Sequence, residues 1–145
     1  MNEANEDSEA VLGSEARRVR VLVAEDNPVN QMVMEAMLGS ADIEVVLVDN
    51  GADCVRRIAA VQPDAVLMDC QMPICDGYSA SRQLRAAGWS LPIIAVTASA
   101  LGDEEARCRQ AGMDAFMAKP VRRDALLEVI EHFCSATVGG TTQGR

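Results

Sequence analysis

The sequence has little positive charge and few aromatic residues. Among 145 residues, 22 are acidic and 13 are basic, which gives a formal net charge of −9, and aromatic side chains make up 3%. Modules that bind nucleic acids need a basic surface to neutralise phosphates, and those that bind single strands use aromatic rings to stack bases. These two shortages argue against direct binding of nucleic acid.

Long apolar runs and paired cysteines are also missing. No run approaches the roughly 20 apolar residues of a membrane-spanning helix, and the acidic N-terminal residues are unlike a secretory signal. The five cysteines form no C-x-x-C pair, and His132 is the only histidine, so no zinc-site pattern is present. We therefore expect no membrane span in this segment, free thiols and a cytoplasmic location.

Composition divides the chain into a central domain and two tails. Residues 1–17 are acidic and poor in apolar side chains, and we predict a disordered acidic tail or linker there. Residues 137–145 are rich in glycine and threonine, which predicts a flexible C-terminal tail. The ordered domain is expected at residues 18–136, a length that suits one hydrophobic core.

Five short apolar runs alternate with five helix-length stretches in this domain. The runs lack polar alternation, which is typical of parallel strands buried on both faces; they are residues 21–24, 45–48, 65–68, 93–96 and 115–118. Helices are predicted from Pro28 to near Gly39 and at 51–61, 78–87, 103–111 and 124–134. This order predicts an α/β domain with a parallel sheet and right-handed crossovers.

Polar side chains follow four of the predicted strands. Glu25 and Asp26 follow the first, Asp69 the third, Thr97 the fourth and Lys119 the fifth. Ligands of open parallel sheets bind beyond the carboxyl ends of the strands, so these groups are expected to converge there. Clustered carboxylates need a cation, and oxygen ligands favour Mg²⁺. With that cation, one carboxylate can act as nucleophile toward a phosphoryl group whose oxygens contact Thr97 and Lys119.

Four motifs stand in order at these strand ends. They are V-A-E-D-N-P-V-N at 23–30, M-D-C-Q-M-P-I-C-D-G at 68–77, A-V-T-A at 95–98 and M-A-K-P at 117–120. Together they closely resemble the receiver domain of two-component response regulators, over essentially the whole predicted domain. The first motif is most similar to receivers of hybrid histidine kinases. The resemblance implies a flavodoxin-like (βα)5 doubly wound sandwich with parallel sheet order 2-1-3-4-5.

The resemblance also implies a phosphoacceptor and a metal site. Asp69 would accept the phosphoryl group and form an acyl phosphate. Mg²⁺ would be held by Asp26 and Asp69 directly, by Glu25 largely through water, and by the backbone carbonyl of Gln71.

A conformational switch is implied by the same resemblance. Thr97 and Lys119 would contact the phosphoryl group, and the Lys119–Pro120 bond would be cis. Phosphorylation would draw Thr97 inward and let Phe116 rotate into the vacated space. Lys119 is the only lysine in the chain, whereas the other basic residues are all arginine.

The implied partner is a histidine kinase or a histidine phosphotransfer protein. The chain would then be a phosphoacceptor domain rather than an enzyme, either alone or as part of a longer protein such as a hybrid histidine kinase. An aspartyl-phosphate phosphatase is one alternative, but that class carries a second Asp two residues after the nucleophile, where this chain has Gln71. An inert pseudo-receiver that only binds proteins is another, which the complete set of acids, threonine and lysine disfavours.

The first predicted helix carries more apolar side chains than one buried face requires. Its apolar residues span too wide an arc, so some must face outward or sideways; they are Val29, Met32, Val33, Met34, Ala36, Met37 and Leu38. One hypothesis is a methionine-rich docking patch for a helical, histidine-bearing partner. The alternative is a deeply buried helix, and the sequence does not decide which of Met32 and Met34 is exposed.

Overall fold

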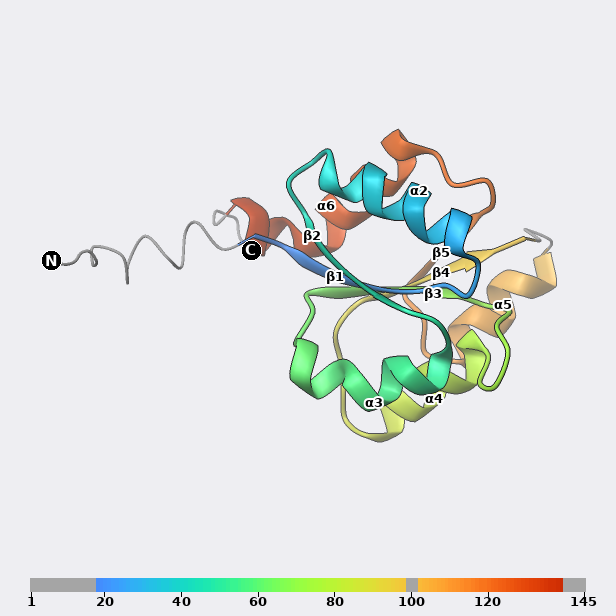
Figure 1. The fold of residues 1–145 in the computed structure, drawn as a ribbon. Helices are drawn as coiled ribbons and strands as arrows, with labels where there is room; N and C mark the ends of the chain where they lie inside the picture. Colours follow the sequence, from blue (N-terminus) through green and yellow to red (C-terminus); the bar gives the residue numbers. More distant parts are fainter. Residues whose placement is uncertain (1–17, 99–101, 140–145) are drawn as a thin grey trace, which may run out of the picture.

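The computed structural model describes residues 18–98 and 102–139, in which five strands and five helices alternate (Figure 1). The strands are β1 (Arg20–Ala24), β2 (Glu44–Val48), β3 (Ala65–Asp69), β4 (Ile93–Thr97) and β5 (Ala115–Ala118). The helices are α2 (Pro28–Gly39), α3 (Gly51–Val61), α4 (Gly77–Ala86), α5 (Gly102–Gln110) and α6 (Arg123–Gly139). Each strand begins and ends within one residue of its predicted limits, because apolar runs between polar punctuation define buried strands well.

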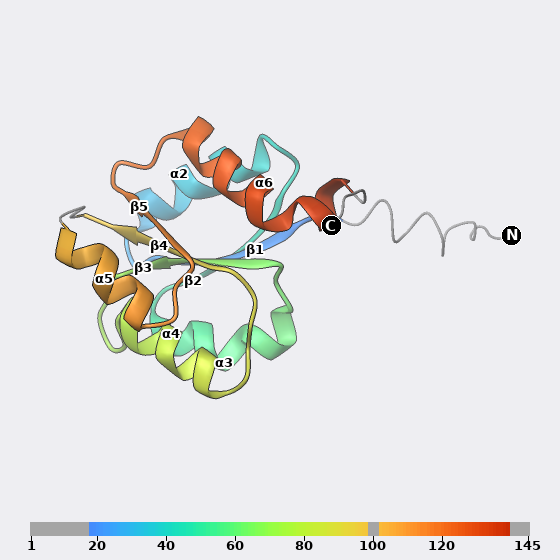
Figure 2. The ribbon, with the colours of Figure 1, turned by 180° about the vertical axis from the view of Figure 1, so that it is seen from behind.

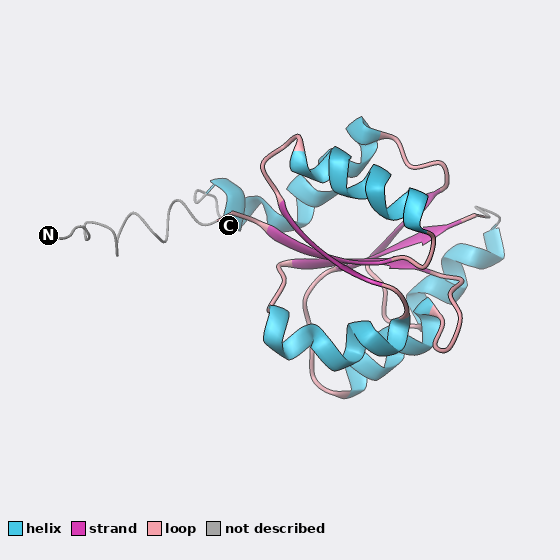
Figure 3. Cartoon of the chain, viewed as in Figure 1, coloured by secondary structure: helices cyan, strands magenta, loops and turns pink. Residues whose placement is uncertain are grey.

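The strands form one parallel sheet in the order β2-β1-β3-β4-β5, which confirms the predicted order. Helices α2 and α6 cover one face, and α3, α4 and α5 cover the other (Figures 1 and 2). The result is a helix–sheet–helix sandwich (Figure 3). All residues of the central strand β3 and of its neighbour β4 are buried, which explains their unbroken apolar sequences up to the final polar residue.

Alternating side chains of each strand enter two separate cores. In β1, Val21 and Val23 pack on the side of α2 and α6, where Leu126 of α6 joins them. Leu22 and Ala24 belong to the core under α3, α4 and α5. A shift of one residue in register would exchange these two sets, so the double burial fixes the position at which each strand ends.

The helices that follow the first three strands start from capping side chains. Asn27, Asn50 and Asp76 accept hydrogen bonds from backbone N–H groups in the first turns of α2, α3 and α4. Pro28 occupies the first turn of α2, where its missing N–H costs nothing. These caps keep the loops at the carboxyl edge short and defined.

Helix α6 extends to Gly139, three residues into the segment predicted as a flexible tail. Nothing between Asp124 and Gly139 is a glycine or proline, so the sequence contains no stop signal in that interval. The predicted tail at residues 1–17 and residues 140–145 lie outside the described residues. Among the helices that are described, none combines the length and apolar character needed to cross a bilayer.

Arg85 ties together two loops at the amino edge of the sheet. Its guanidinium donates to three backbone carbonyls at 2.8–2.9 Å, those of Trp89, Leu91 and Gly112. It also lies 2.9 Å from Asp114 Oδ2, which in turn accepts from the backbone N–H of Ile93 at 2.9 Å. Arg85 and Asp114 are therefore paired with each other and hydrogen-bonded to the backbone.

Candidate functional site

Three carboxylates meet at the carboxyl edge of the sheet. Glu25 and Asp26 follow β1 and Asp69 ends β3, and one oxygen from each lies within 4.8 Å of the other two. Glu25 is 1% and Asp69 4% exposed, whereas Asp26 is exposed. Buried carboxylates this close repel one another, so the donor set suits a hard divalent cation such as Mg²⁺. The structure therefore brings the three predicted acids together.

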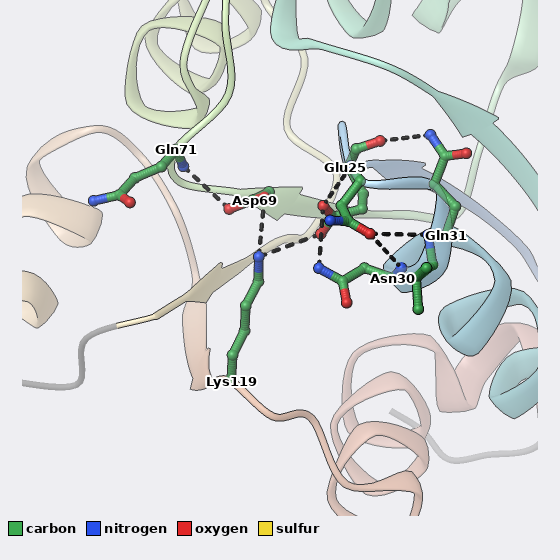
Figure 4. Close-up of polar contacts among 8 residues, drawn as sticks. Glu25, Asn30, Gln31, Asp69, Gln71 and Lys119 are labelled. Carbon is green, nitrogen blue, oxygen red and sulfur yellow. Dashed lines mark hydrogen bonds and ion pairs between the residues drawn. The ribbon is translucent and has the colours of Figure 1, made fainter.

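Lys119 provides the positive charge within this cluster. Its Nζ atom lies 3.1 Å from Asp69 Oδ2 and 3.4 Å from Glu25 Oε1 (Figure 4). Burial by itself lowers the pKa of Lys119, but the hydrogen bond and charge of Asp69, with Glu25, outweigh it and leave the pKa raised. One ammonium thus pairs with two of the three carboxylates, those of Glu25 and Asp69. The Lys119–Pro120 bond is cis, as the resemblance implied.

The first turn of α2 holds the Glu25 carboxylate. Oε2 accepts from the backbone N–H of Asn27 at 2.9 Å and from the side-chain amide of Asn30 at 3.5 Å (Figure 4). Oε1 is buried and has the ion pair with Lys119 but no hydrogen bond. The pKa of Glu25 is raised, chiefly because the carboxyl group is buried and also because the charge of Asp69 is close. The hydrogen bond from Asn27 and the charge of Lys119 lower the pKa but do not cancel the increase. An oxygen of this kind is suited to a metal-bound water.

The loop after β3 fixes the orientation of Asp69. The backbone N–H of Gln71 donates to Asp69 Oδ1 at 3.1 Å, while Lys119 contacts Oδ2. Gly77, at the start of α4, lies so close to the backbone carbonyl of Asp69 that a Cβ atom there would collide with it. Its N–H donates to the Cys70 carbonyl at 3.1 Å, which closes the loop. Both carboxylate oxygens of Asp69 are therefore held in defined positions.

Thr97 and Phe116 project from the same face of the sheet. In the β4–β5 register, Ala95 pairs with Phe116 and Thr97 with Ala118, so the two side chains share a face two positions apart. Thr97 is buried, and Phe116 is half-buried against the core under α3, α4 and α5. The structure thus places Thr97 at the carboxyl edge and Phe116 on the same face, two positions nearer to the amino edge.

Sequence reasoning missed two polar residues of α2. The Gln31 side-chain amide donates to the backbone carbonyl of Glu25 at 2.6 Å (Figure 4). It also donates to Asp49 Oδ1 at 2.9 Å. Asn30 contacts the Glu25 carboxylate, as described above. The sequence does contain a pattern that indicates their position near Glu25. Asn27, Asn30 and Gln31 are spaced i, i+3 and i+4, so they share one face at the start of the helix.

Two hollows flank the carboxylates. The helix-side groove, about 390 Å³, lies along α2 and the segment after β5, and its lining includes Glu25, Val33, Met37, Lys119 and Val121. The loop-side pocket, about 460 Å³, lies beside the β3–α4 loop, and its lining includes Asp26, Gln71, Pro73, Tyr78 and Arg107. The guanidinium of Arg107 lies 4.2 Å from the centre of the Tyr78 ring. The carboxylate cluster can therefore be approached from both sides.

Helix α2 presents an apolar face to solvent next to the helix-side groove. Met32 is 68%, Val29 66% and Val33 45% exposed, whereas Met34 is buried. We call Val29, Met32 and Val33 the α2 patch. The structure thus resolves the choice that the sequence left open between Met32 and Met34.

Known proteins with similar sequences and folds agree with this geometry. A family model described as response regulator receiver domain matches residues 21–131. The sensor histidine kinase RcsC of Escherichia coli (strain K12) is 36% identical over 110 residues, which are 76% of this chain and 12% of RcsC. This chain therefore spans a small part of the length of that relative.

Two solved structures have the same fold. The receiver domain of sensor histidine kinase PA1611 from Pseudomonas aeruginosa PAO1, with a magnesium ion coordinated in the active site cleft, is 45% identical, with a TM-score of 0.76 over 82% of this chain and 99% of that chain. The co-crystal of the Saccharomyces cerevisiae histidine phosphotransfer protein Ypd1 and the Ssk1 receiver domain contains a match of 26% identity and TM-score 0.76, over 83% of this chain and 92% of that chain.

The motifs at four strand ends, the sheet order and these matches all lead to one family. The predicted similarity to receivers of hybrid histidine kinases is confirmed by the sensor kinases among the relatives. The chain belongs to the response regulator receiver domain family of two-component signalling.

Proposed function

We propose that this receiver domain accepts a phosphoryl group on Asp69 from a phosphohistidine, with Mg²⁺ bound, and changes conformation as a result. The observation that carries the proposal is the cluster of three carboxylates, with one oxygen of each within 4.8 Å of the other two, and Lys119 paired with two of them. Repulsion among clustered carboxylates destabilises a fold, but the same cluster binds a divalent cation favourably. The magnesium ion in the PA1611 receiver domain supports the choice of metal.

The residues present fit Mg²⁺. Glu25, Asp26 and Asp69 offer one carboxylate oxygen each, and the backbone carbonyl of Gln71 would complete the protein ligands. The buried Oε1 of Glu25, which lacks a hydrogen bond, fits an outer-sphere contact through water. When bound, the ion neutralises the carboxylates and the oxygens of an incoming phosphoryl group.

The remaining groups position the nucleophile and its substrate. The Gln71 N–H and Lys119 hold the two oxygens of Asp69, so the carboxylate is oriented before the donor arrives. As an Asp69 oxygen forms its bond to phosphorus, the bond to the donor imidazole nitrogen breaks, and the electron pair stays on that nitrogen. Lys119 then pairs with a phosphoryl oxygen, whose negative charge replaces that of the carboxylate.

Thr97 and Phe116 form the proposed switch. The Thr97 hydroxyl would donate a hydrogen bond to a phosphoryl oxygen and move toward it. Phe116, on the same face of the sheet and half-buried, would rotate into the space that Thr97 leaves. The local charge change at Asp69 would thereby bias a two-state packing arrangement between β4 and β5.

The proposed donor is a histidine kinase or a histidine phosphotransfer protein, in the cytoplasm, where the five unpaired cysteines fit a reducing environment. Its histidine-bearing helix would dock on the α2 patch, since this patch adjoins a groove that reaches Glu25 and Lys119. The receiver bound to Ypd1 in the Ssk1 complex supports this partner class. Met32→Ser should therefore slow transfer from a phosphohistidine protein without changing the response to a small phosphodonor.

Membership of the receiver family supports a phosphoacceptor over an enzyme at the level of the family. The phosphatase alternative requires turnover of a phosphate monoester, so steady release of phosphate from para-nitrophenyl phosphate would favour it. A pseudo-receiver would fail to accept phosphate from any donor.

The deciding experiment is phosphotransfer from purified, phosphorylated histidine kinases and histidine phosphotransfer proteins to the wild type and to Asp69→Asn. Labelling should require Mg²⁺ and fall below detection in Asp69→Asn, because an amide cannot form the acyl phosphate. Asp114→Asn, at the amino edge, is the matched control and should remain labelled. Labelling that persisted in Asp69→Asn would refute the assignment of Asp69.

A further inference from the structure

Gln31, near the start of α2, binds both ends of the short segment that carries Glu25 and Asp26. Its side-chain nitrogen donates to the Glu25 carbonyl at 2.6 Å, so the side chain reaches back from the helix toward β1 (Figure 4). Its backbone N–H makes the first hydrogen bond of the helix, to the Asn27 carbonyl at 2.9 Å. Asp26 lies between these two anchor points, so one residue holds the segment at each end.

The Glu25 carbonyl belongs to the peptide group that joins Glu25 to Asp26. Because a peptide group is planar, fixing its oxygen restricts the rotation of Glu25 about ψ and of Asp26 about φ. On its other side Glu25 is held by β2, since its N–H donates to the Val48 carbonyl at 3.1 Å. Glu25 thus points inward and is 1% exposed, while Asp26 is exposed. The backbone that presents both acids is therefore fixed from two directions.

The Gln31 amide is itself oriented by the end of the neighbouring strand. The same nitrogen donates to Asp49 Oδ1 at 2.9 Å, and Asp49 directly follows β2. Both hydrogens of the amide have acceptors, so a rotation of the side chain would lose a hydrogen bond. A brace between α2 and β2 would need only the bond to Asp49. The bond to the Glu25 carbonyl goes further, because it fixes the peptide group between two of the three clustered acids.

We propose that Gln31 is a positioning residue for the metal site, which holds the Glu25–Asp26 peptide in the orientation that lets both carboxylates serve Mg²⁺. This rests on the metal site of the proposed function. Mg²⁺ demands near-ideal octahedral geometry, whereas Ca²⁺ accepts oxygen ligands in flexible arrangements. A residue that orients the ligands should therefore matter more for Mg²⁺ than for Ca²⁺. A residue that only stabilises the fold should affect the binding of both ions alike.

The test measures the binding of Mg²⁺ alone and of Ca²⁺ alone by two-dimensional NMR titration of the purified chain. Gln31→Met removes both amide hydrogens but keeps the length of the side chain, its neutrality and a good helix former. Gln31→Ala removes the same donors by truncation. Gln110→Met is the matched control, because Gln110 is an exposed glutamine at the end of α5. Since every substitution exchanges one neutral side chain for another, the charge at the site stays constant.

Gln31→Met and Gln31→Ala should raise the dissociation constant for Mg²⁺ about tenfold, the lower end of the range for groups that orient metal ligands. The dissociation constant for Ca²⁺ should rise by a smaller factor. Gln110→Met should bind both ions as the wild type does. An unchanged dissociation constant for Mg²⁺ in the Gln31 variants, or equal factors for the two ions, would overturn the proposal.

Failure of the proposed function is recognised separately. A wild-type chain that binds no Mg²⁺ at millimolar concentration would refute the metal site, and the role of Gln31 with it. A wild-type chain that binds Mg²⁺ but accepts no phosphoryl group on Asp69 would refute the proposed function. In that case the two dissociation constants would still decide the role of Gln31.

Discussion

The two edges of the sheet differ in how their charged side chains are balanced. At the amino edge, Arg85 and Asp114 form a pair, and the remaining donors of Arg85 reach backbone carbonyls. At the carboxyl edge, the carboxylates of Glu25, Asp26 and Asp69 lie together, and Lys119 pairs with Glu25 and Asp69. A buried oxygen of Glu25 lacks a hydrogen bond. The charges of Arg85 and Asp114 balance each other, whereas the carboxylate cluster carries more negative charge than Lys119 can balance.

This difference distinguishes a structural charge network from a site. Charges that are paired with each other and hydrogen-bonded to the backbone connect loops and need no ligand from solution. An uncompensated cluster costs stability, which is tolerated where a ligand of opposite charge binds. Variants at the two edges should therefore change stability in opposite directions.

The largest expected effect is at the amino edge. Arg85→Ala should lower the free energy of unfolding by about 3 kcal/mol, because it leaves three backbone carbonyls and a carboxylate without their donor. Urea denaturation measures this. Arg109→Ala, which removes an exposed ion pair with Glu105, is the control and should cost about 0.5 kcal/mol or less. Equal losses would mean that Arg85 is not a structural clamp.

Addition of Mg²⁺ should stabilise the wild-type chain. Binding to the folded state alone raises the free energy of unfolding by roughly 1.4 kcal/mol at about ten times the dissociation constant. Thermal unfolding with and without Mg²⁺ measures the change, and Asp26→Asn should reduce it strongly. A midpoint that is unaffected by Mg²⁺ at millimolar concentration would contradict the metal site.

Lys119→Arg should not be a conservative change. The site requires a compact ammonium close to both Asp69 and Glu25, whereas a guanidinium is planar and bulkier. The rate of labelling by a small phosphodonor should fall about tenfold or more, and the phosphorylation-dependent shift in the Phe116 environment should be lost. Two-dimensional NMR of the labelled variant would detect the shift, and a wild-type response would show that charge alone suffices.

The smallest effect compares two matched carboxylates without metal. Asp114→Asn should destabilise the fold by about 1 kcal/mol, because it weakens a charged pair at the amino edge. Asp26→Asn should stabilise the metal-free fold by about 0.5 kcal/mol, because it removes repulsion at the carboxyl edge. Denaturation in the presence of EDTA measures both. If both variants destabilised the fold, the carboxylates at the carboxyl edge would not be under net repulsion, and the two edges would not differ in this respect.

Much of the fold and site could be predicted because both depend on local patterns. Uninterrupted apolar runs predicted the strands, and the order of strands and polar residues predicted that Asp69, Thr97 and Lys119 lie at one edge of the sheet. The exposure of Met32 rather than Met34 could not be predicted, because it depends on how α2 is rotated about its axis on the sheet. The left-handed backbone of Ile74 could not be predicted either, since it is imposed by Gly51 and other distant contacts.

The most direct test of the account identifies the residue that carries the phosphoryl group. The wild-type chain is incubated with acetyl phosphate and Mg²⁺, and borohydride then reduces the acyl phosphate to an alcohol that peptide mass spectrometry can locate. One modified aspartate is expected, at position 69, and no modification is expected when EDTA replaces Mg²⁺. Modification at another residue, or at Asp69 without dependence on Mg²⁺, would contradict it.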